Sequence, residues 1–73
     1  MKQAEKEHIA KEISGAFAEY LVTNNVKLSE AGVVLSALLA CLEDAHNKDE
    51  FVAGMSGHKD LPNNVIHEIT RRI

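Results

Sequence analysis

The side chains best suited to bind a metal or attack a substrate are four histidines and one cysteine. His8, His46, His58 and His67 show no HExxH pattern and no pair four residues apart, so the spacing typical of zinc ligands is missing. Cys41 lies in the most apolar stretch of the chain, where a cysteine behaves as a small buried hydrophobe. We therefore expect no metal centre, and we expect Cys41 to belong to the core.

Two further patterns suggest chemistry and lack the spacing for it. In the run Gly54-Met55-Ser56-Gly57-His58 the second glycine directly follows the serine, whereas a nucleophile elbow reads G-x-S-x-G after a strand. Asp44, Asp49 and Glu50 crowd one connection without the alternating ligand positions of a calcium loop. Since no nucleophile, base and orienting group can be assembled, we expect neither catalytic residues, nor a cofactor, nor a small-molecule substrate.

Composition defines the class of protein to which these residues belong. The chain has 73 residues, a net charge of −3 and 45% hydrophobic residues, which is typical of one folded domain over 1–73. The acidic balance disfavours binding to nucleic acid phosphates. We expect a cytoplasmic protein that does not enter membranes, because a single cysteine cannot form an internal disulfide and no apolar leader or spanning stretch is present.

Hydrophobic periodicity predicts an all-α fold, a small bundle of three to four helices. Ile9, Ile13, Phe17 and Leu21 recur every four residues, which is the helical period. The helices expected from such patterns and from cap signals cover 3–23, 29–46, 48–54 and 62–72.

Local signals set these expected boundaries. Ser29 has the type of an N-cap residue, with Leu28 placed to pack on Val33 as a hydrophobic staple. Asn47 and Glu50 have the spacing of a capping box, and Gly54 should end the short helix that follows. The last helix should carry Pro62 in its first turn.

The second helix is apolar on nearly all sides between Val33 and Leu42. A domain this short cannot easily cover every side of such a helix, so we predict a homodimer. The predicted function is that of a small non-enzymatic interaction or regulatory module that binds itself and another protein. The candidate interface residues are Val34, Leu35, Leu38, Leu39 and Leu42, with Phe17 and Leu21 from the first helix.

A DNA-binding regulator with a helix-turn-helix is the alternative hypothesis. Ala53 and Gly57 lie four residues apart, as in many such motifs, and the last helix carries side chains of types that contact bases and phosphates. The connection between the two helices is longer than the compact turn of that motif. The candidate nucleic-acid-binding residues are Asn63, Asn64, His67 and Arg71.

A second form of this alternative comes from the order of features along the chain. The order of short motifs along the chain resembles that of the Hha-type modulators of nucleoid proteins. These motifs are Asn24, Leu28-Ser29-Glu30, Ser36-Ala37 and Leu61-Pro62-Asn63-Asn64-Val65. The chain differs from that family by extra residues before Leu61 and by fewer aromatic and arginine residues. The resemblance implies binding to a DNA-organising protein, with little direct contact to DNA.

Overall fold

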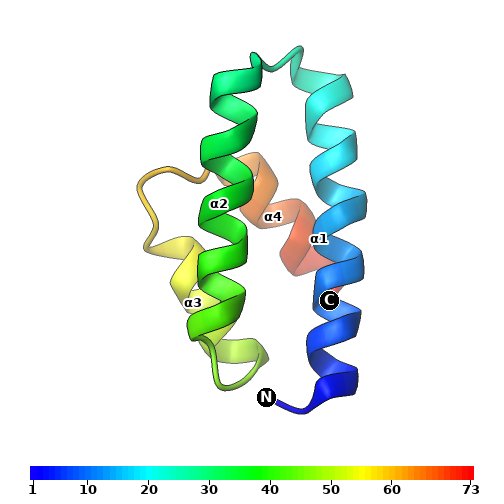
Figure 1. Cartoon of the computed structure of the whole chain (residues 1–73), viewed down its shortest axis with the longest axis vertical. Helices are drawn as coiled ribbons and strands as arrows, with labels where there is room; N and C mark the ends of the chain where they lie inside the picture. The colour runs from blue at the N-terminus through cyan, green and yellow to red at the C-terminus, as the bar shows by residue number, and fades with distance from the viewer.

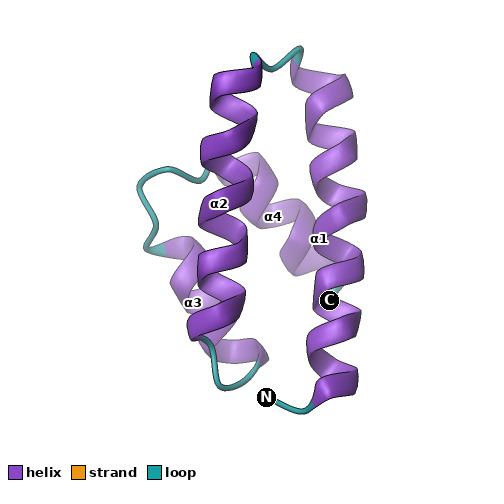
Figure 2. Ribbon diagram, in the orientation of Figure 1, coloured by secondary structure: helices purple, strands orange, loops and turns teal.

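Helices make up most of the chain in the computed structural model, which describes residues 1–73. Figure 2 shows helices joined by short loops and no strand, so the all-α prediction is confirmed, with four helices. The helices are α1 (Gln3–Asn24), α2 (Leu28–Asp44), α3 (Lys48–Ser56) and α4 (Asn63–Arg72).

The first helix ends as its sequence predicts, within one residue. Its apolar residues recur at four-residue steps, and two of them, Ile9 and Ile13, are almost completely buried. Asn25, the residue after its last turn, has φ 49° and ψ 53°. This is the left-handed conformation that asparagine tolerates and that commonly ends a helix.

The predicted start of α2 is wrong by one residue. Lys27, not Ser29, is the N-cap, because its carbonyl already accepts the N–H of Ala31 at 2.9 Å. No side chain caps this end of the helix. The expected staple is also wrong, since Leu28 is 90% exposed and Val33 is 50% exposed.

The connection between α2 and α3 is used to cap α3. Helix α2 ends at Asp44, before the expected residue 46, because Ala45 is extended and His46 turns its N–H to the Glu50 carboxylate at 2.9 Å. The Asn47 side chain accepts the N–H of Glu50 at 2.9 Å, which confirms one half of the predicted capping box, while the Glu50 side chain accepts from His46 and not from Asn47.

The last two helices differ slightly from expectation. Gly54 does not end α3, which continues to Ser56 and buries Met55 completely. One glycine lowers helix stability by only about 1 kcal/mol, less than the burial of a large side chain contributes. Pro62 precedes α4 as its N-cap, and its carbonyl accepts the N–H groups of Val65 and Ile66.

The four helices form two layers. In Figure 1, α1 and α2 run antiparallel in front, while α3 and α4 lie behind them. Each helix packs against two others, since α1 and α3 both contact α2 and α4. The molecule measures 34 × 21 × 18 Å.

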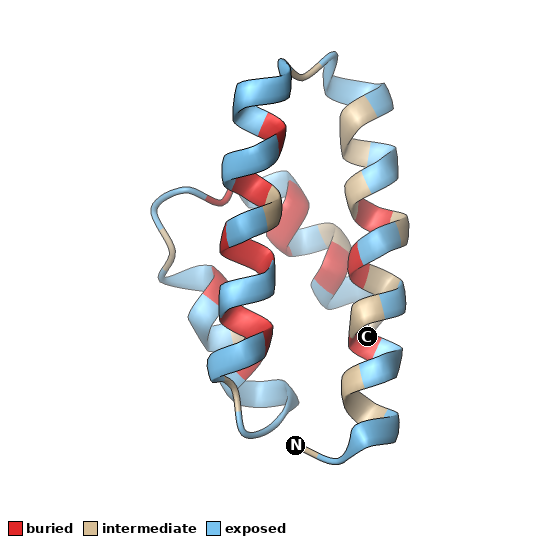
Figure 3. Ribbon diagram, viewed as in Figure 1, coloured by how far each residue is buried: buried red, intermediate tan, exposed pale blue.

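The core fills the space between these layers and contains no polar side chain. Figure 3 shows that the buried positions of each helix lie on one side of it, with exposed positions opposite. No helix combines the length and apolar character needed to cross a membrane. The largest fully buried side chains are Phe51, Ile9, Ile13, Leu38, Met55 and Ile69.

Candidate interaction surface

Helix α2 presents an apolar side to solvent. Its buried residues all lie toward the other helices, so residues at steps of three and four between them form an opposite, exposed side. We call this side the outer face of α2. It consists of Ser29, Gly32, Val33, Ser36, Leu39, Ala40 and Glu43.

The composition of the outer face is unusual for a surface helix. No charged residue occurs between Glu30 and Glu43, although solvent-facing helix surfaces ordinarily carry charged and polar side chains. Val33 and Leu39 are each 50% exposed, and Leu28 beside them is 90% exposed. Three of the four large exposed hydrophobic residues of the chain therefore belong to α2.

A shallow groove of about 570 Å³ runs along this face. Three of the residues that line it, Gly32, Ser36 and Ala40, are small and lie at four-residue intervals. His58 and Asp60, from the loop between α3 and α4, form its wall on one side. A Cβ atom built on Gly32 would have nothing within 4 Å, so the space above this residue is open.

Most of the predicted interface residues lie elsewhere. Val34, Leu38 and Leu42 are 4%, 0% and 6% exposed, because they pack into the core of their own chain. Phe17, Leu21 and Leu35 are half-buried, and Phe17 packs against the core. Leu39 alone is well exposed.

The apolar character of α2 is therefore shared between the core and the surface. Periodicity could not separate these two uses, because residues of both kinds are apolar and the buried side depends on where α3 and α4 lie. The one sequence signal for the outer face was the row of small residues at positions 32, 36 and 40, which is typical of a helix approached closely by another helix.

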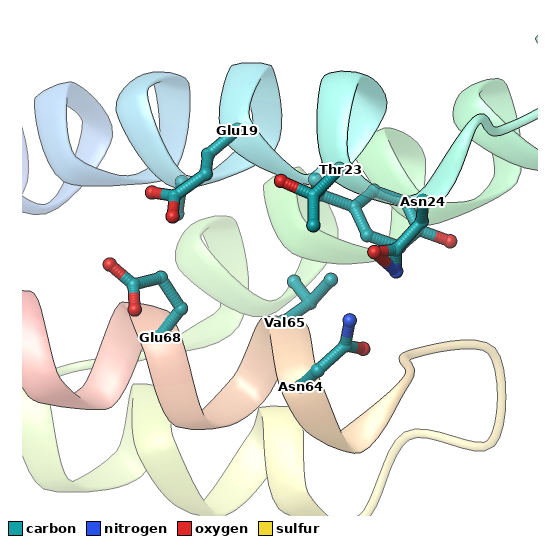
Figure 4. A pocket seen from close by; sticks show the side chains of 8 residues that line it. Glu19, Thr23, Asn24, Asn64, Val65 and Glu68 are labelled. Carbon is teal, nitrogen blue, oxygen red and sulfur yellow. The ribbon is translucent and has the colours of Figure 1, made fainter.

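The predicted nucleic-acid-binding residues share the exposed side of α4, opposite the buried Val65, Ile66 and Ile69, and line two hollows. Asn63, His67 and Arg71 line one hollow between α3 and α4, whereas Asn64 lines another between α1 and α4. Figure 4 shows Asn64 and Glu68 of α4 opposite residues of α1 across this second space, which measures about 180 Å³.

Both arginines of α4 are already paired with glutamates. Arg71 donates to both carboxylate oxygens of Glu68, and Arg72 donates to Glu68 at 2.7 Å and to Glu19 at 2.8 Å. Glu12 lies 3.5 Å from Arg72 as well. The hydrogen bonds from Arg71 and Arg72 lower the pKa of the Glu68 carboxyl and raise the pKa of both arginines. The surroundings of α4 thus offer little free positive charge to a phosphate.

The side chains that could act as nucleophiles or metal ligands are not grouped together, or they are buried or already hydrogen-bonded. Burial, followed by the nearby Asp44 carboxylate, raises the pKa of the Cys41 thiol, which disfavours the reactive thiolate. The Ser56 hydroxyl donates to the carbonyl of Val52 at 3.0 Å. No three His, Cys, Asp or Glu side chains are grouped so that they could hold a metal ion.

No family model, curated protein or solved structure matches the chain. The surface geometry is therefore the basis for inferring function. Its most distinctive feature is the outer face of α2, which carries no charged residue before Glu43 and exposes Val33 and Leu39 beside small residues.

Proposed function

We propose that this chain is a small, non-enzymatic protein–protein interaction module that acts in the cytoplasm as a homodimer and binds through the outer face of α2. The observation that carries the proposal is the absence of charge between Glu30 and Glu43 on a helix whose outer side meets solvent. A monomeric protein rarely keeps such a face uncovered, because covering exposed apolar surface is favourable.

The expected strength of association follows from the side chains involved. Leu28, Val33 and Leu39 would each contribute on the order of 1–2 kcal/mol when covered, in each of two copies. Loss of translational and rotational freedom opposes association by about 4–15 kcal/mol. At the favourable end of both ranges the balance is about 8 kcal/mol, which corresponds to a dissociation constant of about 1 μM, so the dimer should be no tighter than this and should depend on protein concentration.

Sedimentation velocity across micromolar concentrations tests this proposal. The native chain should shift from monomer to dimer, and Leu39→Glu should remain monomeric because it would bury an unpaired carboxylate in the contact. Val22→Glu is the matched control: Val22 is 85% exposed on α1, away from the outer face, so the same kind of change should leave the dimer intact. A native chain that stays monomeric at every concentration would refute the homodimer.

A substitution at Leu38, the neighbour of Leu39 in the sequence, allows loss of association to be distinguished from loss of the fold. Leu38 is 0% exposed, so Leu38→Ala should lower the free energy of unfolding by about 2–5 kcal/mol. Leu39→Glu should leave the thermal unfolding of the monomer nearly unchanged. If Leu39→Glu unfolded the chain as Leu38→Ala does, the outer face would be structural and the proposal would fail.

A DNA-binding regulator is the second candidate, supported by the exposure of Asn63, His67 and Arg71 along one hollow. The pairing of Arg71 with Glu68 weighs against it. Retention of genomic DNA fragments at low salt, lost in Arg71→Ala, would favour this function over the interaction module. Absence of retention would remove it.

A further inference from the structure

We propose that α2 pairs with α2 of a second copy in an antiparallel arrangement, with the two-fold axis passing beside Ser36. This inference rests on the proposed homodimer and specifies its geometry. Three properties of the outer face carry it: its residue order on either side of Ser36, the sizes of these residues, and the charges at the two ends of the helix.

The outer face has the same kinds of residue at equal distances on both sides of Ser36. Gly32 and Ala40 lie four residues away, and Val33 and Leu39 lie three residues away. In an antiparallel pair with a two-fold axis at Ser36, residues at equal distances on opposite sides of the axis lie at the same level along the contact. An interface of this kind is complementary to itself without any second surface.

Residue size makes this contact favourable. Each large residue is adjacent to a small one, as Val33 is to Gly32 and Leu39 is to Ala40. In the antiparallel pair the partner's Leu39 would lie over Gly32, where space is open, and Val33 would lie over the partner's Ala40. Small residues along the centre allow the two helix axes to approach closely.

Charge selects the antiparallel over the parallel direction. The C-terminal end of α2 carries Glu43 and Asp44 and no basic residue in its last turn, although carboxylates are unfavourable at this negative end of the helix dipole. The N-terminal end has no side-chain cap. A parallel pair would place Glu43 beside the partner's Glu43.

The antiparallel pair would bring the acidic C-terminal end of each α2 next to the uncapped N-terminal end of the other. It would place Glu43 opposite the partner's Ser29, where the first N–H groups of the helix favour a negative charge. Glu30 lies outside the outer face and lines a hollow with Tyr20 and Pro62. Asp60 lines both this hollow and the groove beside Ser29, so it is a carboxylate that would weaken this preference. Helix dipoles pointing in opposite directions add to the same preference.

Single-cysteine cross-linking tests the arrangement in a Cys41→Ala background whose fold is verified by circular dichroism. Ser36→Cys should form a disulfide-linked dimer under mild oxidation, because the two-fold axis brings this residue next to its own copy. Ser29→Cys alone and Glu43→Cys alone should not, since each would lie about 20 Å from its equivalent at about 1.5 Å per residue. A mixture of the two chains should cross-link as a heterodimer, identified by mass.

The outcomes separate this inference from the proposed function. Ready cross-linking of Ser29→Cys to itself would indicate a parallel pair and overturn the arrangement while leaving the dimer in place. A dimer in sedimentation with no Ser36→Cys cross-link would likewise overturn it. A monomer in sedimentation would refute the proposed homodimer itself. If Cys41→Ala fails to fold, the same variants in the native background, with the native chain as blank, give the same comparison because Cys41 is buried.

Discussion

At the residue scale, the absence of a side chain at Gly15 of α1 leaves room for Arg72 of α4. Gly15 lies inside α1, where glycine lowers helix stability by about 1 kcal/mol relative to alanine. A Cβ atom at this position would come 2.6 Å from Nη1 of Arg72. The glycine thus leaves room for the guanidinium to lie against α1 and reach Glu12 and Glu19.

A double-mutant cycle should reveal this coupling. In an Arg72→Ala background, Gly15→Ala should raise the free energy of unfolding by about 1 kcal/mol, because only the helix propensity changes. In the native background the gain should be smaller, since the guanidinium must move away from its partners. Urea denaturation of the four proteins gives the comparison. Equal gains in both backgrounds would mean that Gly15 is not required by Arg72.

At the scale of the element, the start of α3 depends on two caps from different parts of the chain. The Asn47 side chain accepts the N–H of Glu50 at 2.9 Å, which is a local contact. The Glu5 carboxylate, from α1, accepts the N–H of Lys48 at 3.0 Å. The second cap therefore also holds the first turn of α1 against α3.

Removing the local cap should destabilise the protein measurably. Asn47→Ala should lower the free energy of unfolding by about 1 kcal/mol, because an N–H at the helix start loses its acceptor. Asn63→Ala is the matched control, since Asn63 is exposed and α4 begins without a side-chain cap. Thermal or urea unfolding measures both variants. Equal effects of the two substitutions would contradict the capping role.

These two caps illustrate what the sequence predicts. Asn47 was predictable, because a cap and its target lie three residues apart and need no knowledge of the fold. The Glu5 contact was not, since it joins residues 43 positions apart. The same holds for α2: periodicity predicts that it is a helix, but which of its apolar sides is buried depends on α3 and α4. Leu38 and Leu39 look alike in sequence and differ completely in burial.

At the scale of the whole molecule, ion pairs on the surface join the last helix to the first. Arg72, the last residue of α4, bonds Glu68 within its own helix and Glu19 on α1. Contacts between α1 and α4 complete the packing in which every helix has two neighbours. Two carboxyl groups, Glu68 of this cluster and Glu50 at the start of α3, have a lowered pKa in the folded chain, so folding should respond to pH.

Acid should weaken the fold through Glu68 and Glu50. Hydrogen bonds from Arg71 and Arg72 lower the pKa of Glu68, and those from the backbone and side chain of His46 lower the pKa of Glu50. Unfolding restores both groups to the ordinary pKa of about 4.3, so the unfolded state binds more protons below that pH. The stabilisation is therefore present above about pH 5 and is lost as the pH falls through the lowered values.

Urea denaturation between pH 7 and pH 3, at one protein concentration, measures this dependence. Glu68→Gln should be less stable than the native chain at pH 7 and should lose less stability on acidification, because its proton uptake on unfolding has been removed. Glu7→Gln, which changes an exposed carboxylate outside any ion pair, should retain a slope close to that of the native chain. If Glu68→Gln kept the native slope, its carboxylate would contribute nothing to the acid sensitivity.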